Sequence, residues 1–210
     1  MEEKDYLRDI SEIKNMMSKS SQFISLSGLS GILAGIYALI GAWFANDILM
    51  KFRNTDEYCQ INSENISDNE IVRSLVAIAL TVIVLSLFSG ILLSSLKAKK
   101  AGEKLWNTTS RRLLVNFAIP LATGGIFTLL LLQKEYYDLV AASTLVFYGL
   151  GCVNASKNTF RDVRYLGLTI IILGLIATAF SGYSLLLWAI GFGFCHIFYG
   201  AIMYFKYDRK

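Results

Sequence analysis

The sequence predicts an all-α, polytopic membrane protein with six transmembrane helices. Three observations indicate this fold. Four apolar segments of roughly 20 residues and two slightly shorter ones follow one another, polar loops join them, and basic residues concentrate in alternate loops. A helix of about 20 apolar residues is long enough to cross the roughly 30 Å hydrocarbon core of a bilayer. Composition agrees, since 54% of the residues are hydrophobic, 17% are charged and the mean hydropathy is +0.49.

The six predicted spans are about 22–45, 71–96, 113–132, 139–156, 165–180 and 185–205. They divide the chain into a cytoplasmic amphipathic helix over 1–21, a transmembrane domain over 22–205 and a short cytoplasmic tail over 206–210. Six helices with short loops use nearly the whole length of 210 residues, so we expect no soluble module beside them.

The distribution of Lys and Arg predicts the orientation. The N-terminal segment, the loops 97–112 and 157–164 and the tail together hold sixteen basic residues, whereas the other side holds four. Basic loops remain in the cytoplasm, so both termini are predicted to lie inside. The net charge of +4 belongs to these loops and therefore does not indicate nucleic-acid binding.

Short related strings predict a threefold repeat of two-helix hairpins, at about 22–96, 113–156 and 165–205. The second helices carry LFSG at 87–90, VFYG at 146–149 and IFYG at 197–200. The first helices match more weakly, with Gly35, Gly125 and Gly174 each followed by two large residues. Small residues admit close approach of helices in lipid, so we expect a bundle with pseudo-threefold character.

The third span contains the only proline, Pro120. Proline removes the hydrogen bond to the carbonyl of Asn116 and favours a kink, beside which lies Thr123. Broken helices with freed carbonyls build the midplane sites of many transporters. A structural kink satisfied by neighbouring groups is the alternative.

His196 is the only histidine and falls inside the sixth span. An ionisable group within a membrane is a functional candidate because burying it is costly. Pairing with Tyr148 or Asn154 would form a proton-responsive network, and a neutral interhelical contact is the alternative. No metal site is predicted, because several ligands at set spacing are absent.

Three tyrosines occupy comparable places in the predicted repeats: Tyr37, Tyr148 and Tyr199. They could line a cavity and bind a ligand, or they could pack between helices with satisfied hydroxyls.

Two segments on the predicted cytoplasmic side favour partners. Apolar residues of the N-terminal segment follow a four-three-four spacing that suits a protein partner, self-association or the membrane surface: Tyr6, Ile10, Ile13 and Met17. A basic loop with one tryptophan is expected to bind anionic lipid headgroups through Lys97, Lys99, Lys100, Lys104, Trp106, Arg111 and Arg112.

Four stretches resemble a six-span membrane protein family of Bacteroidota: GLSGILAGIY at 28–37, LWNTTSRR at 105–112, IPLATGG at 119–125 and VNASK at 153–157. The resemblance covers nearly the whole chain and implies a bacterial inner-membrane location, without an activity. The three Gly-rich hairpins are more distantly similar in architecture to the HdeD-type acid-resistance membrane proteins, and no residue is transferred from them.

The sequence favours a membrane-embedded accessory or sensing protein that works with a cytoplasmic or membrane partner. The alternative is a channel or transporter for a small solute, with its path near Asn116, Pro120, Tyr148 and His196. No nucleophile–base arrangement, phosphate-binding loop or paired carboxylate appears in the spans, so we expect neither enzymatic activity nor a cofactor.

Overall fold

The structure is a computed structural model that describes residues 26–58, 68–100, 102 and 106–209. The described residues form helices joined by short turns, and none of them forms a strand. Six helical segments are long and apolar enough to cross a membrane. The structure therefore confirms the predicted all-helical fold with six helices that could cross a membrane.

Five spans are long helices: α2 (Gly28–Tyr58), α3 (Asp68–Lys100), α4 (Thr108–Gln133), α5 (Val140–Ala155) and α6 (Arg161–Ala179). Short 3₁₀ turns lie at the two ends of α5, η1 (Tyr137–Leu139) and η2 (Ser156–Asn158). The sixth span, Ser181–Asp208, changes its winding along its length: η3 (Ser181–Tyr183), α7 (Ser184–Trp188), the π-helix η4 (Ala189–Cys195), α8 (His196–Met203) and the π-helix η5 (Tyr204–Asp208).

The first two helices are longer than predicted. The helix α2 continues to Tyr58 instead of ending near residue 45, and α3 begins at Asp68, so most of the predicted loop 46–70 is helical. Polar residues continue α2 because they pair along it, as Lys51 Nζ does with the Asp47 carboxylate one turn away at 2.7 Å.

Two basic segments predicted as loop or tail are also helical. Lys97, Lys99 and Lys100 form the last turn of α3, where cations are favoured by the negative end of the helix dipole. The helix α4 begins at Thr108, where Asn107 and Ser110 form a reciprocal capping box, so Arg111 and Arg112 lie in its first two turns. Residues 206–208 of the predicted tail belong to η5.

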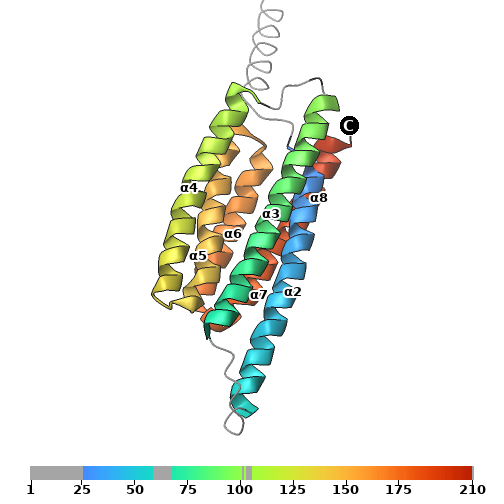
Figure 1. Cartoon of the computed structure of the whole chain (residues 1–210). Coiled ribbons are helices and arrows are strands. Elements are labelled where there is room, and N and C mark those ends of the chain that lie inside the picture. Colours follow the sequence, from blue (N-terminus) through green and yellow to red (C-terminus); the bar gives the residue numbers. More distant parts are fainter. Residues whose placement is uncertain (1–25, 59–67, 101, 103–105, 210) are drawn as a thin grey trace, which may run out of the picture.

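The helices pack in a fixed order that Figure 1 shows. The helix α5 packs against α6, and both contact the sixth span, which in turn packs along α2. The helices α3 and α4 lie on the outside: α3 packs along α2, and α4 packs along α5. Among the described residues, α3 and α4 share no interface comparable with these.

The core lies between α5, α6 and the sixth span. Leu145 and Ile170 are fully buried there, and Tyr148, Trp188 and Phe192 pack against them. By contrast, only 6% of the most apolar 18-residue stretch of α3 is buried within the chain, and the share in α4 is also 6%. These two helices present apolar side chains outward, as membrane-facing helices do.

Candidate functional site

The only histidine lies at the centre of the bundle, where the π-helix η4 meets α8. His196 is 6% exposed, and both of its ring nitrogens have partners. Its Nε2 lies 2.7 Å from the Tyr148 hydroxyl of α5, and its Nδ1 lies 3.0 Å from the carbonyl oxygen of Gly191. The structure thus brings together two of the candidates that the sequence indicates, from two different spans.

The partners of His196 fix the tautomer of its neutral ring. The Gly191 carbonyl can only accept a hydrogen bond, so Nδ1 carries the proton. The Nε2 atom then accepts, and the Tyr148 hydroxyl donates. This neutral pair uses every polar atom it has, so it needs no water or ion to complete it. Among the described residues no buried side-chain nitrogen or oxygen is left without a partner.

Aromatic rings close the space around this pair. The Phe192 ring stacks on His196 with centroids 5.8 Å apart and an interplanar angle of 16°, and it also contacts Tyr148 and Trp188. The Phe117 ring of α4 meets Tyr148 edge-on at 5.7 Å. The arrangement is a packed interhelical contact. The π-helix allows it, because its wider turn places the carbonyl of Gly191 beside the ring five residues later.

The second candidate, around Pro120, is satisfied in a similar way. Proline lacks the N–H that would bond to the carbonyl of Asn116. Instead, Asn154 Nδ2 of α5 donates to that carbonyl oxygen at 2.7 Å. The Asn116 side chain reaches onward, and its Nδ2 donates to Asn158 Oδ1 at 2.8 Å. The helix α4 continues through Pro120 without a break, from Thr108 to Gln133.

The remaining candidates do not extend either cluster. Thr123 is exposed, and its hydroxyl donates to the carbonyl of Ile119 in its own helix at 2.9 Å. The Tyr199 hydroxyl lies 3.4 Å from Thr169 Oγ1, a weak contact, and Tyr37 is half-buried on α2. An open hollow lies elsewhere, near the turn between α4 and α5, and is lined by Glu135, Tyr136, Tyr137, Asp138, Leu139, Thr178 and Ser181.

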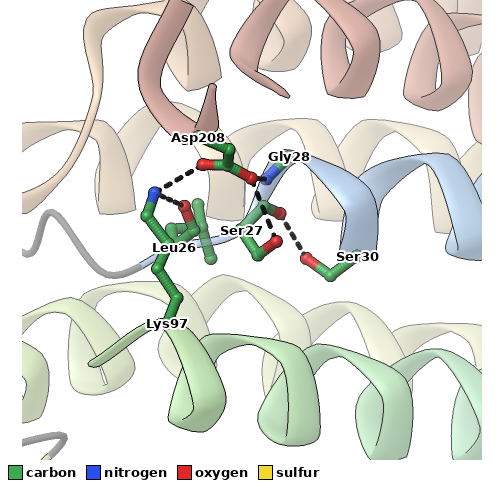
Figure 2. Close-up of polar contacts among 6 residues, drawn as sticks. All are labelled: Leu26, Ser27, Gly28, Ser30, Lys97 and Asp208. Atoms are coloured by element: carbon green, nitrogen blue, oxygen red, sulfur yellow. Dashed lines mark hydrogen bonds and ion pairs between the residues drawn. The ribbon is translucent and has the colours of Figure 1, made fainter. Parts of the chain in front are cut away.

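A polar junction that the sequence did not indicate lies at the basic end of the bundle, where α2 begins and where α3 and the sixth span end. Asp208, at the end of the sixth span, accepts hydrogen bonds from three groups of the first hairpin. Lys97 Nζ of α3 donates to Oδ1 at 2.6 Å, and the N–H of Gly28 and the hydroxyl of Ser27 donate to Oδ2 at 2.8 and 3.1 Å. Lys97 Nζ also donates to the Leu26 carbonyl at 2.9 Å (Figure 2).

This Asp208 junction is made by Leu26, Ser27, Gly28, Lys97 and Asp208. In it the ammonium group of Lys97 contacts a carboxylate and a carbonyl of the chain, and its binding to a lipid headgroup stays a prediction. The Asp208 side chain is 9% exposed and that of Lys97 is 22% exposed, so water screens the pair poorly. Asp208 is the single acidic residue in the basic tail 206–210, which is the one sequence signal for it.

A second ion pair holds α6 at the same end. Lys206 Nζ lies 3.1 Å from Asp162 Oδ2, and the Tyr207 hydroxyl donates to the same oxygen at 2.9 Å. The last two turns of the sixth span therefore bond to the first hairpin through Asp208 and to α6 through Lys206 and Tyr207.

Apart from Lys97, the predicted headgroup residues that the structure describes are exposed at this end. They are Lys99, Lys100, Trp106, Arg111 and Arg112. Lys104 and the predicted partner-binding residues Tyr6, Ile10, Ile13 and Met17 lie outside the described residues.

Within the described part of the chain, no three His, Cys, Asp or Glu side chains come together in a way that could hold a metal ion. Comparison of the chain with protein-family models, curated proteins and solved structures found no match.

Proposed function

We propose that this chain is an integral membrane accessory or sensing module that works through a protein partner at its basic end. The Asp208 junction carries this proposal. One carboxylate joins the start of α2, the end of α3 and the end of the sixth span. The N-terminal segment 1–25 leads directly into this point, so a force or a partner acting on that segment acts on three helices at once.

The contacts of the pathway candidates support the transport alternative less well. The polar groups of His196 and Tyr148 bond to each other and to Gly191, and the carbonyl freed by Pro120 is bonded by Asn154. A path for a small solute needs polar groups that face an open space and remain available to the solute.

The orientation belongs to the same proposal. The sixteen basic residues of the N-terminal segment, the two basic loops and the tail support placing both termini in the cytoplasm. The resemblance to the Bacteroidota family supports the bacterial inner membrane. Exposed Lys99, Lys100, Arg111 and Arg112 suit anionic headgroups on that side, with Trp106 at the interface.

We also infer that the three hairpins are related units. The matching strings support this, and so do the glycine contacts between hairpins. Gly149 of α5 meets α6, and Gly200 of α8 meets α2, at the same place in the VFYG and IFYG strings.

Site-specific photocrosslinking tests the partner proposal. A photoreactive amino acid is placed at Tyr6, Ile10, Ile13 or Met17 of the full chain in its own membranes, with Arg8 and Asn15 as controls off the apolar seam. We expect one and the same protein to be captured from two or more seam positions and from neither control. Capture without this position dependence would overturn the proposal.

Purified protein in vesicles tests the alternative. Proton or solute flux that depends on the protein and is lost in His196→Ala with Tyr148→Phe would establish transport. We expect no such flux.

A further inference from the structure

Two interfaces between neighbouring hairpins are built in the same way, beginning with their glycines. At the α5–α6 interface, a Cβ added to Gly149 would lie 2.7 Å from the carbonyl oxygen of Gly167 and 3.0 Å from the backbone nitrogen of Ile171. At the interface of α8 with α2, a Cβ added to Gly200 would lie 2.9 Å from the carbonyl oxygen of Gly28 and 2.7 Å from the nitrogen of Ile32. In each case the glycine belongs to the second helix of one hairpin and lies against the backbone of the first helix of another hairpin.

The correspondence continues one turn and more along both interfaces. A Cβ on Gly174 of α6 would meet the side chain of Val146 at 2.7 Å and its nitrogen at 3.0 Å. A Cβ on Gly35 of α2 would meet the side chain of Ile197 at 2.6 Å and its nitrogen at 3.0 Å. The two interfaces therefore share the register of their contacts, residue by residue.

The same register places a third pair of faces on α3 and α4. Gly90 of α3 holds the place of Gly149 and Gly200, and Gly125 of α4 holds the place of Gly174 and Gly35. Yet a Cβ at either Gly90 or Gly125 would have no atom within 4 Å. The residues of α4 that correspond to the contacted positions are small and exposed, Ala118 and Ala122, and Leu87 of α3 is 55% exposed.

We propose that a second copy of this chain completes this third interface, with α3 of each copy packed against α4 of the other. A twofold axis along the membrane normal produces two identical contacts at once. Each copy offers the Gly90 face of α3 and the Gly125 face of α4, and each face meets the other kind of face on the second copy. The helices α3 and α4 follow one another in the chain and cross the membrane in opposite directions, as α5 and α6 do. The paired faces therefore meet antiparallel, as in the interfaces already made.

Contact between α3 and α4 of the same chain is the competing arrangement, and it requires the hairpins to move. Bringing α3 against α4 would move the first or the second hairpin as a body. That movement would open the contact of Gly200 with α2 or that of Gly149 with α6, where the backbones already touch. A second copy uses the open faces without disturbing either contact. The proposal rests on the inferred relation of the three hairpins, but it concerns a different surface from the N-terminal segment, so partner capture by that segment is tested separately.

Disulfide trapping between two distinguishable chains tests this pairing. Cys59, Cys152 and Cys195 are replaced by Ser, and Leu87→Cys and Gly125→Cys are introduced into separate chains with different tags. The two variants are reconstituted together in phosphatidylglycerol-containing vesicles and oxidised. We expect a disulfide-linked heterodimer. Leu87→Cys mixed with Ile172→Cys of α6 is the control, because Ile172 is also exposed to lipid at 57% but lies on another face.

Two further measurements make the outcome decisive. Gly90→Ile and Gly125→Ile fill the proposed contact, and we expect each to lower the dimer association constant about tenfold or more in single-molecule photobleaching. Thermal unfolding of the diluted monomer should not shift to lower temperature, since a Cβ at either position meets no atom within 4 Å. Monomers at every protein-to-lipid ratio would overturn the proposal. So would a disulfide that forms only within one chain when Leu87→Cys and Gly125→Cys are combined.

Discussion

The carboxylate of Asp208 accepts a hydrogen bond from the backbone N–H of Gly28 at 2.8 Å, although 180 residues separate the two. The last helical turn of the chain thereby caps the first turn of α2. The first N–H groups of a helix have no partner within it and carry partial positive charge, so a carboxylate there both satisfies a donor and interacts favourably with the dipole. Lys97 neutralises the same carboxylate from the other side.

Replacing Asp208 with Asn should destabilise the bundle by about 2 kcal/mol, because it keeps the shape of the side chain but removes the charge that three donors share. The measurement is the free energy of unfolding in mixed micelles with increasing denaturing detergent. Asp47→Asn is the matched control. Its pair with Lys51 is as short, at 2.7 Å, but the two side chains are 48% and 72% exposed, so we expect a loss within about 0.5 kcal/mol. Equal losses in the two variants would contradict the role given to the Asp208 junction.

Removing the hydroxyl in Tyr148→Phe should lower the free energy of unfolding by about 1 kcal/mol, because His196 Nε2 loses its donor in a buried site. A double-mutant cycle with His196→Leu isolates the pair, and we expect a coupling energy of about 0.6–1.7 kcal/mol, the range for hydrogen bonds between membrane helices. Tyr199→Phe is the control, since its hydroxyl makes only a 3.4 Å contact with Thr169. A cycle that closes to zero would show that the two side chains act independently.

Glycine-to-alanine changes should separate close interfaces from open surface. Gly149→Ala and Gly200→Ala each place a Cβ within 2.7 Å of the backbone of the neighbouring span, so the helices must move apart. We expect each to lower the free energy of unfolding by about 1–2 kcal/mol, an overpacking cost partly offset by the better helix propensity of alanine. Gly182→Ala meets no atom within 4 Å and should be neutral. Losses that differ widely between Gly149→Ala and Gly200→Ala would argue against the shared register.

How well each feature could be predicted depends on how far apart in the sequence the interacting residues lie. The spans could be located because the bilayer requires a long apolar helix, which leaves a signal in consecutive residues. Pairing of His196 with Tyr148 was one of two options in the sequence, since a polar group in lipid must find another polar group nearby. The Asp208 contact with Gly28 leaves no signal in consecutive residues that joins the two, because 180 residues separate them, and only the single acid in the basic tail stands out.

The winding of the sixth span could not be predicted either. Residues 189–195 are apolar or glycine almost throughout, and a π-helix and an α-helix of such residues look alike in sequence. The extension of α2 beyond residue 45 was missed for the opposite reason. Charged residues there indicate a loop by composition, whereas the Asp47–Lys51 pair at i and i+4 favours continued helix.

The contact between Asn154 and the Asn116 carbonyl should be needed only while residue 120 is proline. Asn154→Leu removes the donor and leaves that carbonyl unpaired, so we expect a loss of about 1 kcal/mol in the free energy of unfolding. Pro120→Ala restores a backbone N–H that bonds to the same oxygen, and in that background Asn154→Leu should be close to neutral. Unfolding of the four variants of this cycle in mixed micelles measures the difference. If Asn154→Leu lowers the free energy of unfolding equally in both backgrounds, its effect comes from packing of α5 against α4. The proposed role of Asn154, bonding the carbonyl that Pro120 leaves unpaired, is then wrong.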